Sequence, residues 1–241
     1  MSDRASLGTV LLTGASRGLG RQLALRLAGR AERLALVARD AEAAGELAAH
    51  IRAAGDTRAE AFAHDLAAPD GAGLCAAAVH EAFGDVDVLI NNAGVGHWRP
   101  FLEHGPAEHD RIIDVNFRAV VHLTQAVLPA MVARGRGHVV NIASDLATRP
   151  LGNMAVYAAT KFALRGFSLS LSQEVRPRGV RVTLVNPGLI DTAFGGRVEG
   201  SLDARGALQP DELARLVVEM IEQPGHQLVD EVTVHALGQD Y

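Results

Sequence analysis

The feature that most constrains the fold of this chain is the regular alternation of short apolar runs with helical patterns, which continues along its 241 residues. The runs at 86–90 and 138–143 are almost entirely apolar, which is typical of strands covered by helices on both faces. Strand–helix alternation favours parallel strands joined by right-handed crossovers. The pattern therefore predicts an α/β fold, a doubly wound three-layer sandwich.

The same pattern gives the expected elements. The length suits one α/β domain covering residues 1–241, with a weakly patterned loop at about 193–209 that we expect to be mobile and to face the substrate. We expect strands at 9–13, 34–38, 59–63, 86–90, 138–143, 180–185 and 231–237, and helices at 17–28, 41–53, 72–83, 107–133, 156–175 and 210–221.

Composition excludes several classes of function. The net charge of −5 gives no general attraction to nucleic acid or to anionic membranes. The N-terminus has no signal-peptide pattern, and no apolar run reaches the roughly 18 residues of a membrane span. The one cysteine, Cys75, excludes an internal disulfide and is expected to be a buried apolar residue. We therefore expect a soluble, cytoplasmic protein that binds neither nucleic acid nor membrane.

A glycine-rich turn follows the first predicted strand and opens the first helix. Its glycines are Gly14, Gly18 and Gly20, with Ser16 and Arg17 between them. Glycines in this position let the backbone bend tightly and approach a pyrophosphate at the helix N-terminus. A plain glycine-rich turn is the alternative, and the position between strand and helix argues against it.

A tyrosine and a lysine, Tyr157 and Lys161, lie four residues apart in a predicted helix and so share one face. Lys161 is the single lysine among 23 Lys and Arg residues, which suggests that its compact charge is needed. An ammonium about 4 Å from the phenol, at an effective dielectric of about 20, is worth roughly 4 kcal/mol. We therefore expect the pKa of Tyr157 to fall by nearly three units, toward neutrality, where a general acid–base works best.

These motifs, in this order, resemble the short-chain dehydrogenase/reductase family from about Leu7 to Leu237. The resemblance implies a Rossmann-like fold with a seven-stranded parallel sheet and a nicotinamide cofactor. It implies that Tyr157 is the general acid–base, that Ser144 donates a hydrogen bond to the carbonyl oxygen, and that Lys161 also holds the nicotinamide ribose. It further implies that Asn116 kinks its helix and holds a water in a proton relay. Each residue alone would be an ordinary core or surface residue, and their joint spacing argues against that.

The resemblance also assigns the cofactor site. Asp65 and Leu66 would border the adenine, although Asp65 could equally be a helix cap. Asn92, Ala93 and Gly94 would face the cofactor, and Ile190 and Thr192 would bond its carboxamide. The full set of expected cofactor residues is Gly14, Ser16, Arg17, Gly18, Leu19, Gly20, Arg39, Asp65, Leu66, Asn92, Ala93, Gly94, Tyr157, Lys161, Pro187, Gly188, Ile190 and Thr192.

The end of the second strand bears on the choice of dinucleotide. Arg39 stands where the family's NAD users commonly carry an acid, and Arg17 is a second cation near the adenosine ribose. Two guanidiniums suit the forked hydrogen bonds of a 2′-phosphate, which predicts NADP(H). Both could instead be solvated surface arginines, and Asp40 could turn inward and favour NAD(H).

Substrate identity is weakly encoded. We expect interconversion of a ketone or aldehyde and an alcohol, without a metal ion, on a small molecule that could be carrier-bound, as in a ketoreductase. The alternatives are an NAD-dependent alcohol or hydroxy-acid dehydrogenase and a non-catalytic dinucleotide-binding interaction protein. The family usually forms homodimers or homotetramers. The expected substrate wall is His97, Trp98, Asp145, Leu146, Met154 and Leu189.

Overall fold

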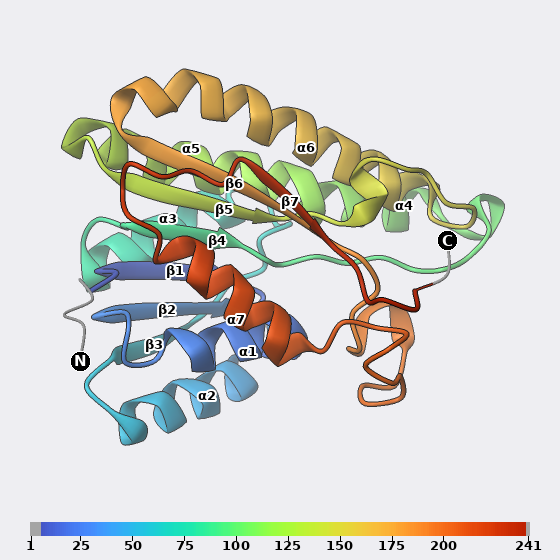
Figure 1. Ribbon diagram of the computed structural model, residues 1–241, viewed down its shortest axis with the longest axis horizontal. Helices are drawn as coiled ribbons and strands as arrows, with labels where there is room; N and C mark the ends of the chain where they lie inside the picture. Colours follow the sequence, from blue (N-terminus) through green and yellow to red (C-terminus); the bar gives the residue numbers. More distant parts are fainter. Residues whose placement is uncertain (1–5, 240–241) are drawn as a thin grey trace.

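A computed structural model describes residues 6–239. Its strands form one seven-stranded parallel sheet in the order β3-β2-β1-β4-β5-β6-β7 (Figure 1). The strands are β1 Thr9–Thr13, β2 Arg33–Ala38, β3 Arg58–Ala63, β4 Val88–Asn91, β5 Gly137–Ile142, β6 Val180–Pro187 and β7 Glu231–Val234. The predicted Rossmann-like sheet is thus confirmed.

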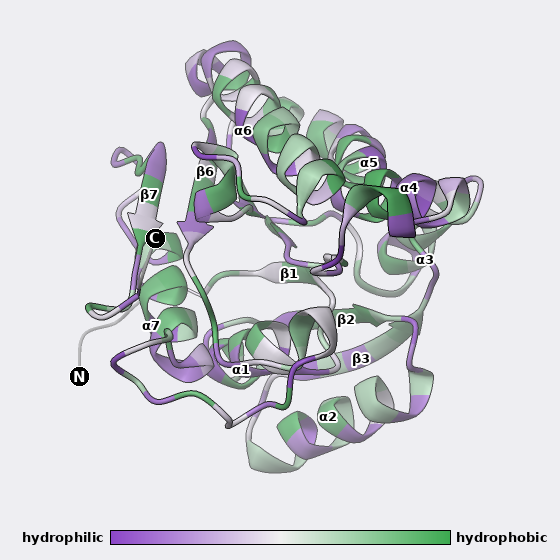
Figure 2. Ribbon diagram, turned by 90° about the vertical axis from the view of Figure 1, so that its right-hand side faces the viewer, coloured by the Kyte–Doolittle hydropathy of each residue, from purple (hydrophilic) through white to green (hydrophobic). Residues whose placement is uncertain are grey.

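Helices cover both faces of this sheet. Figure 2 shows α1, α2 and α7 on one side of the strands and α3, α4, α5 and α6 on the other. The predicted helix at 107–133 is interrupted, because a π-helical turn, Asp114–Arg118, separates two α-helical parts. The helices are α1 Gly18–Leu27, α2 Ala41–Ala54, α3 Gly71–Phe83, α4 Pro106–Ile113, α5 Ala119–Arg134, α6 Ala155–Val175 and α7 Pro210–Ile221.

The apolar strands explain the two helical layers. Leu11 and Leu12 are adjacent in β1, and both are fully buried. Successive side chains of a strand point to opposite faces, so Leu12 packs toward α1 and α7 while Leu11 packs toward α3 and α5. Burying each of these leucine side chains stabilises the folded state by roughly 1.5–3 kcal/mol. The fold is therefore more stable when helices cover both faces of the sheet.

The interrupted helical stretch Pro106–Arg134 is, by length and composition alone, apolar enough to cross a membrane. In the structure its α5 part packs against α3 and β5, and Leu123, Val127 and Met131 belong to the core on that face of the sheet. This is the packing of a core helix.

Strand order also fixes the location of the site. β1 pairs with β2 on one side and with β4 on the other, with Val10 opposite Val88. The crossovers change direction between β1 and β4, and in open α/β sheets ligands bind beyond the carboxyl ends of the strands at such a point. The loops after β1, β2, β4, β5 and β6 meet there.

Candidate active site

A cavity of about 880 Å³ lies at the carboxyl ends of the strands. All the residues that the sequence assigned to the cofactor line it, from the glycine turn after β1 to the loop after β6. This volume is within the range of roughly 300–1,000 Å³ of ligand pockets. The sheet thus brings together segments that are up to about 180 positions apart in the chain, as expected for parallel strands.

The glycine turn is shaped for close packing and for an anion. Gly14 has a φ of +69°, and a Cβ on Gly20 would lie 2.0 Å from the Gly14 oxygen, so neither position accepts a side chain. The structure places no side-chain cap on the N-terminus of α1. The first backbone N–H groups of α1 are therefore available to a phosphate, and the residues fit a dinucleotide.

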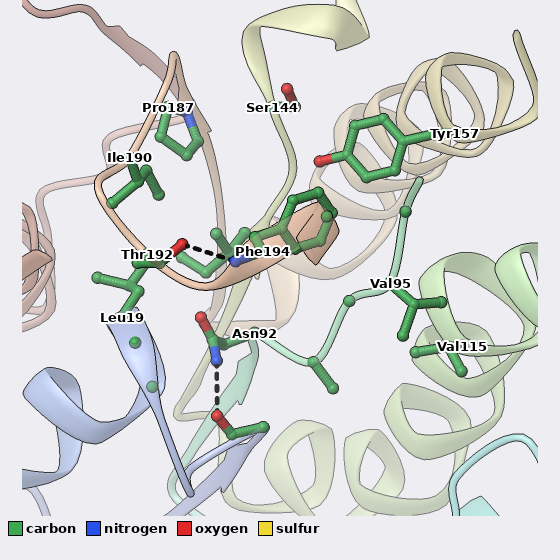
Figure 3. Close-up of a pocket in the computed structure, with 18 of the residues that line it drawn as sticks. Leu19, Asn92, Val95, Val115, Ser144, Tyr157, Pro187, Ile190, Thr192 and Phe194 are labelled. Carbon is green, nitrogen blue, oxygen red and sulfur yellow. Dashed lines mark hydrogen bonds between the residues drawn. The ribbon is translucent and has the colours of Figure 1, made fainter. Parts of the chain in front are cut away.

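Asn92 joins this turn to the loop after β4. Its Nδ2 donates to the oxygens of Thr13 and Gly14 at 2.9 and 3.3 Å. In return, Thr13 Oγ1 accepts from the backbone N–H groups of Asn92 and Ala93, both at 3.0 Å. These bonds account for the polar side chain at the end of a buried strand, and they fix the floor of the cavity (Figure 3).

The ribose end of the cavity is cationic. Arg17 and Arg39 are exposed side chains that line it. Asp40 caps α2, because its Oδ1 accepts from the Ala43 N–H at 3.0 Å. The carboxylate that could have favoured NAD(H) is therefore engaged by a helix terminus.

Asp65 also lines the cavity, and it has a partner that the sequence did not suggest. Its Oδ2 accepts from Arg111 Nη1 at 2.7 Å, and its Oδ1 accepts from the Ala67 N–H at 3.1 Å. The hydrogen bond from Arg111 holds the pKa of Asp65 below its ordinary value. The alternative that Asp65 is a helix cap is wrong, because the N-cap of α3 is Asp70 and the Asp65 carboxylate instead tightens the turn before that helix. Its position in the cavity lining is compatible with a place beside the adenine.

Tyr157 and Lys161 lie one turn apart on α6, and both are buried. Lys161 Nζ donates to the Ile142 oxygen at 3.0 Å and lies 5.5 Å from the centre of the Tyr157 ring. Burial lowers the pKa of Lys161 to about 8. Its ammonium is therefore still charged at neutral pH, but it is easily deprotonated in comparison with an exposed lysine.

The expectation that the pKa of Tyr157 falls is wrong for this structure. Burial raises the pKa of the phenol above its ordinary value, a hydrogen bond with Ser144 opposes the rise, and the charge of Asp145 adds to it. The expectation from sequence counted the attraction between Lys161 and the Tyr157 phenolate, but it left out the free energy needed to remove a phenolate from water. Tyr157 is thus a group that keeps its proton.

Ser144 lies at the end of β5, on the same wall as Tyr157 (Figure 3). Its Oγ accepts from the Leu146 N–H and donates to Asp145 Oδ1, both at 3.1 Å. In Figure 3 the Tyr157 hydroxyl points toward the cavity, and the Phe194 ring lies beside it. The Tyr157 and Phe194 ring centres are 5.5 Å apart.

Asn116 sits in the π-helical turn and is buried behind the lining rather than within it. Its Oδ1 accepts from the Val95 N–H, and its Nδ2 donates to the Val95 oxygen, both at 2.8 Å. Nδ2 also reaches Thr160 Oγ1 at 3.3 Å, one residue before Lys161. Asn116 therefore fastens the loop after β4 to the helix that carries the lysine.

Five of the six residues expected in the substrate wall line the cavity: Trp98, Asp145, Leu146, Met154 and Leu189. His97 does not, which corrects that expectation. Its ring lies 6.1 Å from the ring of His104, in a separate and much smaller hollow. Nearby, the Arg99 N–H bonds to the Asn153 oxygen at 3.1 Å, which ties this segment to the loop before α6.

The loop at 193–209, which we expect to be mobile, contains local structure. Phe194–Gly196 forms a short 3₁₀ turn. The buried Asp191 carboxylate accepts from the N–H groups of Gly200 and Leu202 at 3.1 and 3.3 Å. Phe194 in this loop lines the cavity, whereas Arg111 and Gln239 also line it but were not singled out from the sequence.

Comparison with known proteins agrees with this geometry. The family model described as short chain dehydrogenase matches residues 8–201. An alcohol dehydrogenase from the archaeon Thermococcus sibiricus, complexed with 5-hydroxy-NADP, is 30% identical with a TM-score of 0.90, and the match covers 97% of this chain and 99% of that one.

Two further solved structures are similar. A metagenomic short-chain oxidoreductase in complex with NADP is 38% identical with a TM-score of 0.83, over 95% of this chain and 97% of its own. A 3-ketoacyl-(acyl-carrier-protein) reductase from Brucella melitensis, complexed with NADH, is 31% identical with a TM-score of 0.86, over 98% and 100%. The family match spans more than half of the chain, and the fold agrees throughout. The chain therefore belongs to the short-chain dehydrogenase family of oxidoreductases.

Proposed function

We propose that the protein is an NADP(H)-dependent reductase that interconverts a ketone or aldehyde and its alcohol. The observation that carries this proposal is the grouping of Ser144, Tyr157 and Lys161 on one wall of the cavity, with the exposed Arg17 and Arg39 at its other end. A bound nicotinamide would supply or accept the hydride. The remaining chemistry belongs to the side chains of this chain.

The raised pKa of Tyr157 suits the reductive direction. The phenol holds its proton at neutral pH and can donate it to the carbonyl oxygen as charge develops there. Ser144 can turn its hydroxyl hydrogen from Asp145 to the same oxygen, which stabilises that charge. Lys161, charged below about pH 8, stabilises the phenolate that remains until it is reprotonated.

The proton must then be replaced from solvent. Asn116 and Lys161 face one another across Gly94, since a Cβ at Gly94 would lie 3.6 Å from Asn116 Oδ1 and 3.9 Å from Lys161 Nζ. Because both polar atoms of Asn116 already bond to Val95, its role in our proposal is to hold this gap open for a water, rather than to carry a proton itself.

Preference for NADP(H) rests on the ribose end. Arg17 and Arg39 supply guanidiniums that match a 2′-phosphate, and the capping role of Asp40 removes the competing acid. NADP is also named for the cofactor of the similar metagenomic oxidoreductase. The apolar side chains Trp98, Leu146 and Met154 at the other end favour a carbonyl carried on an apolar body.

The test is oxidation of NADPH, followed by absorbance, with a panel of ketones, aldehydes and thioesters, each paired with the Tyr157→Phe variant as control. Turnover of at least one carbonyl by the wild type and its loss in the variant is the expected result. NADPH binding without turnover of any carbonyl would contradict the proposal and would favour a non-catalytic dinucleotide-binding protein.

We also infer a homo-oligomer. Oligomers are usual in the family, and Phe162 on α6, which is 43% exposed in the isolated chain, is a side chain that a partner subunit would cover. Light scattering of the purified protein distinguishes a dimer or tetramer from a monomer. A monomeric mass at micromolar concentration would contradict this inference.

A further inference from the structure

Beside Ser144 lies a buried carboxylate whose role the reaction does not explain. Asp145 is 5% exposed, and both of its oxygens are bonded. Oδ1 accepts the Ser144 hydroxyl at 3.1 Å. Oδ2 accepts from Arg149 Nη2 at 2.8 Å and from Gln239 Nε2 at 3.1 Å, and His235 Nε2 is 3.5 Å away. Asp145 was expected to contact substrate, but its bonds make it part of the wall itself.

Gln239 is the most distant of these partners in sequence, and it uses both ends of its amide. Nε2 donates to Asp145, and Oε1 accepts from the Leu189 N–H at 2.9 Å. One side chain from the segment after β7 thus joins the loop that carries Ser144 to the loop that follows Pro187. An amide that donates to a carboxylate and accepts from a backbone N–H is fully matched in polarity at both ends.

Gly188 leaves room for this contact. A Cβ at Gly188 would lie 2.1 Å from Gln239 Oε1 and 2.8 Å from His235 Cδ2. The segment is also held by its backbone, because the Gly238 N–H bonds to the Arg205 oxygen at 2.8 Å. Glycine is therefore needed at position 188 because His235 and Gln239, from the segment after β7, pack against it. A cofactor that comes close to this loop would require glycine for the same reason.

We propose that Gln239 is a positioning residue of the active site, acting as a clamp between Asp145 and Leu189. By bonding to Asp145 Oδ2, it holds the carboxylate whose Oδ1 accepts from Ser144, and so fixes the position from which the serine hydroxyl can turn to the carbonyl oxygen. By bonding to Leu189, it fixes the loop that we assign to the nicotinamide. The inference rests on the proposed reductase function for its effect on rate, but not for the clamp itself.

Two substitutions test the clamp. Gln239→Leu removes both hydrogen bonds at similar volume, and we expect kcat to fall about tenfold with the KM for NADPH within about twofold. Gln239→Glu keeps the acceptor for Leu189 but places a second carboxylate against Asp145, so we expect a larger loss of kcat. Gln227→Glu makes the same chemical change at an exposed glutamine and serves as the matched control.

A double variant makes the pairing specific. Asp145→Asn keeps an acceptor oxygen for Ser144, but it turns the atom that accepts from both Gln239 and Arg149 into a donor. Combined with Gln239→Glu, it restores a donor–acceptor pair with the polarity reversed. We expect the double variant to have a higher kcat than Gln239→Glu alone. A merely structural role would give additive losses instead.

Hydrogen exchange of the Leu189 amide provides a readout that is independent of activity. In Gln239→Leu the Leu189 N–H loses its hydrogen-bond acceptor, Gln239 Oε1. We expect this amide to exchange about tenfold faster, with the Tm of the protein unchanged. Unaltered exchange and kcat in both Gln239 variants, or a double variant no better than Gln239→Glu, would overturn the proposal. Faster exchange in a protein whose wild type reduces no carbonyl would instead refute the proposed function and leave the clamp standing.

Discussion

Replacing Lys161 by methionine should make the protein more stable and inactive. Lys161 is 4% exposed, and burial lowers its pKa from 10.5 to about 8. A buried ammonium whose pKa falls on folding destabilises the folded state wherever the unfolded chain would still be charged. Methionine has a similar length and no charge, so it fills the same space without the cost of desolvation.

The magnitude follows from the shift. Lowering the pKa from 10.5 to about 8 corresponds to about 3 kcal/mol of lost stability at pH 7. Losing the bond to the Ile142 oxygen offsets about 1 kcal/mol, so Lys161→Met should gain about 2 kcal/mol. This loss of folding stability is fully present below about pH 8, where Lys161 is protonated in both the folded and the unfolded protein. It disappears as the pH rises from 8 through 10.5.

The assay is urea unfolding of the cofactor-free wild type and variant at pH 7 and pH 10, with Met154→Leu as a control for a change at the cavity wall without a change of charge. We expect the variant to be more stable at pH 7 and the difference to shrink at pH 10. Equal stabilities at pH 7, or a gap that widens with pH, would refute the assignment of Lys161 as a desolvated cation.

Other substitutions test the remaining parts of the site. Tyr157→Phe should lower kcat at least about a hundredfold with NADPH affinity intact, and near-normal turnover would rule the phenol out as proton donor. Arg39→Asp should raise the KM for NADPH about tenfold more than that for NADH, whereas equal changes would exclude a 2′-phosphate contact. Asn116→Ala leaves both polar groups of Val95 unpaired and should cost about 2–4 kcal/mol in thermal unfolding, with an unchanged Tm as the contrary result. In wild type, kcat/KM for carbonyl reduction should fall about tenfold from pH 7 to pH 9 as Lys161 loses its charge, and a flat profile would contradict its pKa of about 8.

The sequence predicted the fold well because its signals are local. Alternating apolar runs and helical patterns mark elements over ten or so residues, and the parallel sheet then places every motif that follows a strand at one edge. The glycine turn, Asn92 and Ser144 follow strands and were found in this way, whereas Tyr157 was found from its four-residue spacing to Lys161 on one helix. All of them line the cavity.

The features that escaped prediction depend on packing between distant segments. The pairing of Arg111 with Asp65 and of Gln239 with Asp145 joins residues that are 46 and 94 positions apart, and no spacing rule links them. The pKa of Tyr157 depends on how much solvent the finished wall excludes, which residue types alone do not reveal. The interruption at Asp114–Arg118 was expected only as a kink at Asn116, and the structure shows that it is a π-helical turn.

The strand order has a consequence for how the chain assembles. Within the described sheet, β1 and β4 form the one pairing between strands that are not consecutive in the sequence. The segment from β1 to β3 and the segment from β4 to β7 are each a run of neighbouring strands, so their pairings join residues about 24 to 50 positions apart, compared with the 78 positions between Val10 and Val88. The junction between them closes a loop of about 75 residues, which is the entropically costly step. A dinucleotide bound across the β1–β4 junction would contact both halves of the sheet, β1–β3 and β4–β7. Ligand binding should therefore slow unfolding by stabilising the pairing of these two halves.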